Sequence, residues 1–163
     1  MKEYILYQLK EAKRELTDSI TGLSKKELTS FSPSNHWPIA WIILHCLRNV
    51  DKWLINNITG EFVLKHDEIF DVWPPKKPEE DYEYPDLIEL IKRVTIVFEK
   101  AIGCILGLKE EELLNKFSTK ETLIVSCLRI INHTNSHLRN IWYILGEIKA
   151  DKWPVQKTWI PED

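Results

Sequence analysis

Apolar residues recur every three or four positions along most of the chain, which is the spacing of one face of an α-helix. Between Glu3 and about Ile20 this spacing predicts a first amphipathic helix, and Gly22 is expected to end it. Ser24 and Glu27 have the Ser-x-x-Glu spacing of a capping box and predict a short helical turn. The apolar face of the first helix consists of Ile5, Leu6, Leu9, Ala12, Leu16 and Ile20.

Three longer helices are predicted after this turn, with bounds of about Pro38–Asn57, Asp86–Gly103 or Leu106, and Ser118–Ile148. Pro38 suits a first helical turn, and Asn35 or a neighbour can cap the helix that follows. The last helix is expected to begin with a second capping box, formed by Ser118 and Glu121.

The segment of about 60–85 interrupts the helical pattern. It combines prolines and acidic residues with five aromatic residues, so it is too aromatic for a disordered linker. Long loops in compact domains often have a function. We therefore interpret this segment as a crossover that lies across the helices. Its prolines are Pro74, Pro75, Pro78 and Pro85, and its aromatic residues are Phe62, Phe70, Trp73, Tyr82 and Tyr84.

A short repeat supports a paired arrangement of the helices. The pattern Gly-Leu-x-x-x-Glu-Leu begins at Gly22 and again at Gly107, each time between two predicted helices. Two similar helical hairpins joined by a long connection would produce it. We predict an all-α fold, a four-helix bundle with a long crossover between the second and third helices. Residues 1–163 are expected to form one domain, with a non-helical C-terminal tail of about 150–163.

Composition and charge exclude several classes of protein. The charged fraction is 29% and the formal net charge is −3, with both signs interspersed, so no basic patch indicates nucleic-acid binding. No apolar run approaches the roughly 20 residues needed to cross a bilayer. The N-terminal segment is charged throughout, so we expect no signal peptide. Cys46, Cys104 and Cys127 lie among apolar neighbours, which favours buried, reduced thiols in a cytoplasmic protein.

Two histidines of the predicted fourth helix have the spacing of metal ligands. His133 and His137 are four residues apart, so their side chains project from one face of the helix, one turn apart. They lie at the margin of the apolar arc, where a bundle can open a pocket. The alternative is that they are two polar residues at the edge of a packed helix, since this spacing also arises by chance.

The predicted second helix adds a third histidine. The stretch Trp37–Leu47 is apolar on nearly all sides, and His45 is its one strongly polar side chain. A helix of this kind is buried on nearly all sides, so His45 should face protein or a pocket. A histidine satisfied at a contact between two helices is the commoner case. One buried histidine on the second helix and two on the fourth make a three-histidine metal site a competing interpretation.

Other candidates for the chemistry are weaker. His36 precedes the second helix and His66 lies in the crossover, so both are poorer ligand candidates. Asp51 follows His45 by six residues, on a different face of the helix. The chain contains no glycine-rich phosphate loop, GxSxG, CxxC or HExxH motif. Residues placed to contact the ligands or a substrate are Trp41, Asn49, Ser126 and Asn140.

Together these motifs resemble the DinB/YfiT-like superfamily over nearly the whole chain. The resemblance rests on a tryptophan-rich second helix with His45, Asp51 and Trp53, on the histidine pair of the fourth helix, and on the two Gly-Leu-x-x-x-Glu-Leu segments. It implies a four-helix bundle whose ligands for a divalent metal, zinc or nickel, are His45, His133 and His137. Where the family usually continues with Gly-Gln after the last ligand and its neighbour, this chain has Arg139 and Asn140.

The resemblance also implies a set of activities. Characterised members include S-transferases that use bacillithiol or mycothiol, and others are described as metal-dependent hydrolases. We expect the metal to activate a low-molecular-weight thiol, whose thiolate attacks a small electrophile. A hydrolase that uses a metal-bound hydroxide is the first alternative, with the same three ligands. A non-catalytic bundle that binds a ligand or a partner is the second. A homodimer is plausible for such a bundle.

Overall fold

The computed structural model describes residues 1–32, 34, 36–65, 82–116 and 121–149 of the chain. The predicted all-α class is confirmed. The first helix, α1 (Lys2–Ile20), buries Ile5, Leu9 and Leu16 on one face, as their spacing predicts. After this helix the chain turns at Gly22, whose φ of 79° lies in the left-handed region that glycine adopts readily.

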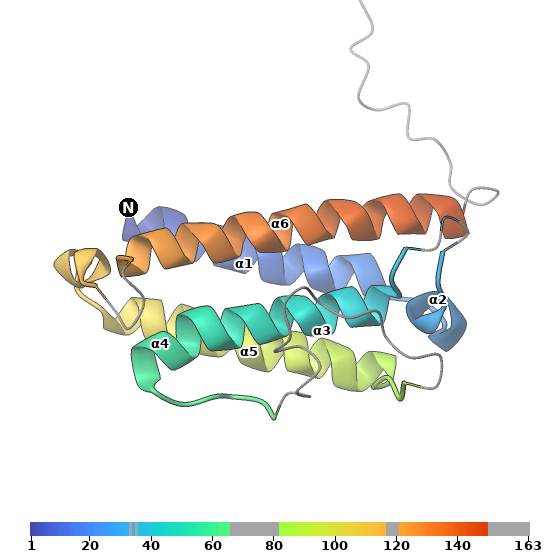
Figure 1. Cartoon of the computed structure of the whole chain (residues 1–163), viewed down its shortest axis with the longest axis horizontal. Coiled ribbons are helices and arrows are strands. Elements are labelled where there is room, and N and C mark those ends of the chain that lie inside the picture. The colour runs from blue at the N-terminus through green and yellow to red at the C-terminus, as the bar shows by residue number, and fades with distance from the viewer. Residues whose placement is uncertain (33, 35, 66–81, 117–120, 150–163) are drawn as a thin grey trace, which may run out of the picture.

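The short helix α2 (Lys25–Thr29) begins with the predicted capping box. The Ser24 hydroxyl accepts a hydrogen bond from the Glu27 amide at 3.3 Å, and the Glu27 carboxylate accepts one from the Ser24 amide at 2.7 Å. The repeated Gly-Leu-x-x-x-Glu-Leu segment also forms a short helix at its second occurrence, the 3-10 helix η3 (Glu110–Leu114). The two lie at opposite ends of the molecule (Figure 1).

The predicted second helix consists of three helical segments that follow one another directly: α3 (Ile39–Val50), the π-helical turn η1 (Asp51–Ile55) and α4 (Asn56–Thr59). Gly60 ends the series in the left-handed conformation, with a φ of 78°. Every residue from Ile39 to Arg48 is buried, which agrees with a stretch that is apolar on nearly all sides.

The third long helix, α5 (Leu87–Gly107), begins where the sequence indicated, because the Asp86 carboxylate accepts a hydrogen bond from the Glu89 amide at 2.8 Å. The last helix, α6 (Leu123–Ile148), begins later than predicted. Thr122 pairs with Lys116 in an isolated antiparallel bridge, so its backbone is extended and Glu121 and Thr122 lie outside the helix. The predicted start of the helix near Ser118 is therefore wrong, and Ser118 itself lies outside the described residues.

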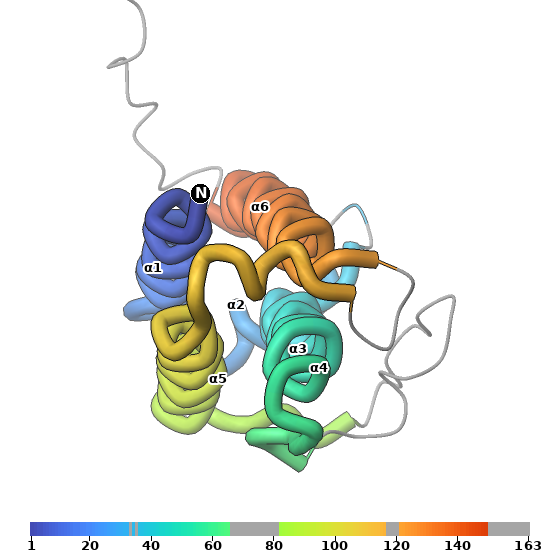
Figure 2. Tube along the Cα trace, turned by 90° about the vertical axis from the view of Figure 1, so that its left-hand side faces the viewer, coloured from blue at the N-terminus to red at the C-terminus, as the bar shows by residue number. Residues whose placement is uncertain are grey.

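Four long helical rods lie side by side in the described part of the chain. α1 packs against α5 and α6, and α3 packs against the same two helices from the opposite corner (Figure 2). α1 and α6 run in one direction, and α3 and α5 run in the other (Figure 1). Neighbouring helices that run in the same direction need a connection that returns along the bundle, which explains the long segment between α4 and α5.

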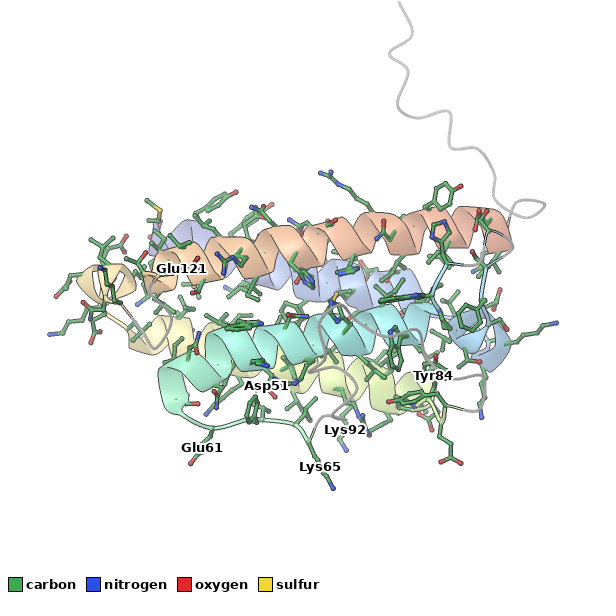
Figure 3. All side chains as sticks on the ribbon, in the orientation of Figure 1. Asp51, Glu61, Lys65, Tyr84, Lys92 and Glu121 are labelled. Carbon is green, nitrogen blue, oxygen red and sulfur yellow. The ribbon has the colours of Figure 1, made fainter. Side chains whose placement is uncertain are left out.

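The described ends of this crossover are attached to the helical segments α3 and η1. The fully buried Asp51 carboxylate accepts hydrogen bonds from the amides of Val63 and Leu64, at 3.0–3.1 Å. In Figure 3, Asp51 lies on the side of the rod that faces the segment carrying Glu61 and Lys65. At the other end, the Tyr82 ring packs edge to face on Trp41, with centroids 5.0 Å apart. Most of the predicted crossover, at 66–81, and the predicted tail lie outside the described residues.

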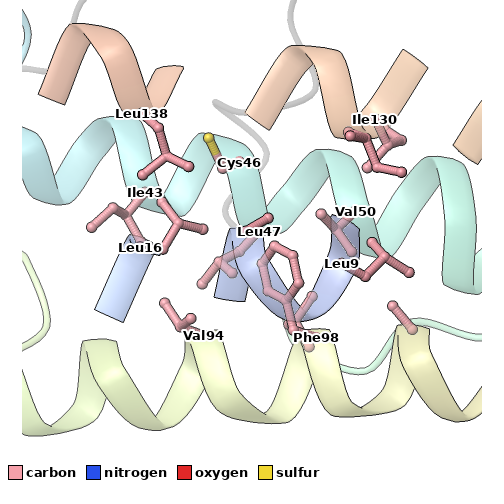
Figure 4. Packing of buried hydrophobic residues seen from close by; sticks show 14 of the residues in the cluster. Leu9, Leu16, Ile43, Cys46, Leu47, Val50, Val94, Phe98, Ile130 and Leu138 are labelled. Carbon is pink, nitrogen blue, oxygen red and sulfur yellow. The ribbon is translucent and has the colours of Figure 1, made fainter. Parts of the chain in front are cut away.

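The core is one cluster of buried side chains contributed by all four rods. Phe98 of α5 lies at its centre among Leu9, Leu47 and Val94 (Figure 4). Two of the cysteines, Cys46 and Cys127, are buried as expected, but Cys104 is only half-buried. Within the described residues, no helix is both long enough and apolar enough to span a membrane.

Replacing Leu47 by alanine should lower the free energy of unfolding by about 2–5 kcal/mol, because Leu47 is fully buried and its loss leaves a cavity. Leu114→Ala is the matched control, since Leu114 is 66% exposed and its truncation should change stability by no more than about 0.5 kcal/mol. Urea denaturation followed by circular dichroism measures both values. Equal effects of the two variants would contradict the assignment of Leu47 to the core.

Candidate metal centre

The three histidines singled out in the sequence lie together between α3 and α6. The Nε2 atom of His133 is 3.2 Å from Nε2 of His45 and 3.2 Å from Nε2 of His137. The ring centroids are 4.5–5.1 Å apart. His45 is 6% exposed, and His133 and His137 are half-buried. Among the described residues, these histidines are the group whose ligand atoms are close enough to hold one metal ion.

Local structure explains this convergence. His45 belongs to a helix whose remaining faces are apolar, and the stripe formed by Ile43, Leu47 and Val50 packs into the core (Figure 4). The His45 side chain lies on the other side, against α6. His133 and His137 are one turn apart on α6, so both reach the same point between the helices. The packing of apolar side chains between α3 and α6 thus brings the imidazoles together.

The separations between the ring nitrogens suit a shared cation. Two nitrogens that are each about 2.0–2.1 Å from a tetrahedral ion lie about 3.3 Å apart, close to the 3.2 Å found here. Hydrogen bonding alone does not account for the cluster. A neutral imidazole nitrogen carries either one proton or one lone pair, so His133 Nε2 can make one well-directed hydrogen bond but has two nitrogen neighbours. A cation would accept the lone pairs of all three Nε2 atoms.

The protonation state of the cluster also fits metal binding. The pKa of His45 is lowered to about 4, chiefly by burial and also by the nearby His137 and His133. Burial lowers the pKa of His137 to about 4 as well, with a smaller contribution from His133. The pKa of His133 is lowered by burial alone. The three imidazoles are therefore neutral at pH 7, which is the form that binds a metal.

Asn49 is the predicted contact residue that lies closest to the cluster. It is one turn beyond His45 on α3, and its amide nitrogen donates a hydrogen bond to the His45 carbonyl at 2.8 Å. The same nitrogen is 3.2 Å from His45 Nε2. The Asn49 amide is thus held at the edge of the site, where it can contact a ligand or a substrate.

A cavity of about 270 Å³ adjoins the cluster at His137. It lies between the start of α3 and the C-terminal half of α6. The predicted contact residue Asn140 is one of its lining residues. Among the described residues, its lining is His36, Trp37, Ile42, His137, Asn140 and Ile144.

The other two predicted contact residues, Trp41 and Ser126, are buried on α3 and α6. Trp41 is 1% exposed and packs edge to face on Trp37 as well as on Tyr82. Ser126 is buried on α6, about two turns before His133. Neither residue lines the cavity. Asp51, which the sequence indicated as a poor ligand, instead binds the backbone amides of the crossover.

Sequence reasoning missed the position of His36. It is not part of the metal-binding group, but it lines the cavity opposite the helix that carries His137. No periodic signal could have revealed this, because His36 precedes α3 and its position depends on how the loop before α3 packs against α6. His66, the other weak candidate, lies outside the described residues.

A family model described as the DinB superfamily matches residues 8–141. The matched range covers most of the chain and contains all three histidines of the cluster. Among curated proteins, none matches the chain.

We expect the metal-free protein to lose stability as the pH falls from 6.5, the ordinary histidine pKa, towards about 4. In this range the folded state keeps His45 and His137 neutral, whereas the unfolded chain protonates both. The unfolded state therefore binds more protons and becomes relatively more favourable. Above pH 6.5 both residues are neutral in either state and contribute no pH dependence. Urea unfolding of chelator-treated protein across this range measures the effect.

The double variant His45→Gln/His137→Gln is the control for this measurement. Carboxylates titrate in both proteins, so their contribution cancels in the comparison. The free energy of unfolding of the variant should depend less steeply on pH between 6.5 and about 4. Identical slopes in the two proteins would mean that the histidines are not kept neutral by the fold.

Proposed function

The chain belongs to the DinB superfamily, and from this premise we propose that it is a metal-dependent enzyme in which His45, His133 and His137 hold one divalent cation. The observation that carries the proposal is the convergence of three Nε2 atoms from two helices on one point. The family resemblance inferred from the histidine and tryptophan motifs is confirmed by the match to the family. The metal, the reaction and the substrates are the proposed part.

The donor set favours zinc or nickel. Imidazole nitrogen is a common ligand of both metals. Three neutral ligands leave the full 2+ charge of the ion uncompensated, and a site with three protein ligands keeps a position open for another molecule. When bound, such a cation lowers the pKa of a thiol or a water molecule at that position.

We propose transfer of a small thiol to an electrophile as the reaction. Two features support it. The cavity beside His137 has apolar walls formed by Trp37, Ile42 and Ile144, which suit a small organic molecule. None of the described residues that line it carries a carboxylate, the side chain that hydrolases commonly use as a general base. A thiol that has lost its proton is itself a strong nucleophile and needs no such base.

The metal site is tested by metal analysis of protein purified without a histidine tag. Wild-type protein should contain about one divalent ion per chain, whereas His133→Ala/His137→Ala should contain almost none, because two of three ligands are removed. Asn132→Ala is the matched control on the same helix, since Asn132 is exposed and should leave the metal content unchanged. Equal and negligible metal in the wild type and the double variant would contradict both the metal-dependent transferase and the metal-dependent hydrolase, and would favour a non-catalytic bundle.

The reaction is tested by following thiol consumption with a panel of electrophiles, using bacillithiol and cysteine as thiols. Metal-loaded wild-type protein should consume thiol at least about tenfold faster than chelator-treated protein, a difference of about 1.4 kcal/mol in the barrier. The His133→Ala/His137→Ala variant should behave like the chelator-treated protein. Hydrolysis of amide or ester substrates without thiol consumption would replace the transferase with the hydrolase.

A further inference from the structure

The cavity beside His137 has a second imidazole at its rim. His36 is exposed and lies in the loop between α2 and α3, on the side of the cavity opposite α6. Its ring packs edge to face on Tyr143 of α6, with centroids 5.3 Å apart and an interplanar angle of 77°. The loop therefore places the His36 ring at a defined position against α6.

Hydrogen bonds fix the loop that carries His36. The His36 amide donates to the Ser32 hydroxyl at 3.1 Å, and the Ser32 amide donates to the His36 carbonyl at 3.4 Å. The neighbouring Ser34 hydroxyl donates to the carboxylate of Glu147, which is one turn beyond Tyr143 on α6. α6 thus holds the loop through Glu147 and the His36 ring through Tyr143.

Glu147 is also a charged neighbour of His36. Its pKa is lowered chiefly by the hydrogen bond from Ser34, and also by the nearby Ser32, Tyr143 and His36. Glu147 positions His36 through the loop, because its carboxylate accepts the hydrogen bond from Ser34. His36 is separate from the three-histidine cluster, although His36 and His137 border the same cavity.

We infer that His36 is the proton donor of the proposed thiol transfer, with Glu147 as its positioning residue, and that the electrophile is a small molecule that develops negative charge on oxygen, such as an epoxide or an α,β-unsaturated carbonyl compound. This inference rests on the proposed function. The cavity volume of about 270 Å³ lies just below the roughly 300–1,000 Å³ of typical ligand pockets, so the electrophile is small. Its apolar body would contact Trp37, Ile42 and Ile144.

With an epoxide, the reaction is a ring opening by the thiolate. The thiol first loses its proton to solvent, and its sulfur forms a bond to a ring carbon of the epoxide. The bond between that carbon and oxygen breaks, and its electron pair goes to the oxygen. Protonated His36 passes a ring N–H proton to this oxygen and later takes up a proton from solvent. The net reaction adds the thiol across one carbon–oxygen bond.

An alkyl halide provides a matched electrophile without this requirement. When a thiolate displaces bromide, the leaving group departs as a stable anion and takes up no proton. A general acid accelerates a reaction only where a proton is transferred in the transition state. The contribution of His36 should therefore depend on the electrophile, whereas a merely structural role would affect both electrophiles alike.

The test compares epoxybutane with bromobutane, with bacillithiol as the thiol and metal-loaded protein throughout. His36→Gln should lower kcat/KM for epoxybutane by about a hundredfold, the lower end of the usual range for general acid catalysis, and leave the value for bromobutane unchanged. Glu147→Gln should cause a smaller loss with epoxybutane alone. Both variants should retain the metal content and thermal midpoint of wild type. Glu111→Gln, an exposed glutamate on η3, is the control.

The possible outcomes separate this inference from the proposed function. If wild type consumes thiol with neither electrophile, the proposed transferase fails and the role of His36 fails with it. If wild type is active but His36→Gln affects both electrophiles equally, or neither, the transferase stands and the inference is overturned. A selective loss with epoxybutane, at unchanged metal content, supports it.

Discussion

The burial of α3 on nearly all sides is the constraint on which the rest of the structure depends. A helix with apolar residues on every face must be covered on every face, because each exposed apolar side chain would cost about 1.5–3 kcal/mol. α5 and α6 flank α3, and the described ends of the crossover pack beside α3 and η1. His45 is the one histidine of α3, and it is buried with its neighbours. Its position against α6 follows from the packing of the apolar stripe on the other side.

The direction of the helices determines the path of the crossover. α3 and α5 lie side by side and run in the same direction, so the chain between them must return along the bundle (Figure 1). The first residues of this connection are attached through the buried Asp51 and through Phe62, whose ring lies 4.7 Å from the guanidinium carbon of Arg48. A buried carboxylate needs such partners, because leaving it without hydrogen bonds would cost several kcal/mol. Asp51 therefore stabilises the fold beside the site and does not belong to the three-histidine cluster.

The site combines two environments along one side of α6. His133 and His137 face the buried interior near His45, where the low polarity keeps the imidazoles neutral. About two turns further on, Tyr143 and Glu147 face the loop before α3, where His36 is exposed to solvent. The cavity lined by His137 and His36 connects the two environments. A buried cluster of three imidazoles and a solvent-accessible imidazole are suited to different tasks, the first to holding a cation and the second to exchanging protons.

Much of the fold was predictable from the sequence, because helices depend on local spacing. The apolar periodicity of α1, the capping box at Ser24 and the cap at Asp86 each involve residues within one or two turns of each other. The start of α6 was not predictable in this way. The Ser-x-x-Glu pattern at Ser118 and Glu121 is locally sound, but the pairing of Lys116 with Thr122 extends the backbone and delays the helix.

The sequence by itself determined the elements and the residue types of the site. The spacing of His133 and His137 settles that they share a face, and the apolar surroundings of His45 settle that it is buried, since both properties belong to single helices. Only the tertiary structure decided that the three Nε2 atoms meet, that Asn49 contacts His45, and that Asn140 and His36 line the neighbouring cavity while Trp41 and Ser126 do not. These relations depend on how α3 and the loop before it pack against α6, and packing between distant segments has no periodic trace in the sequence.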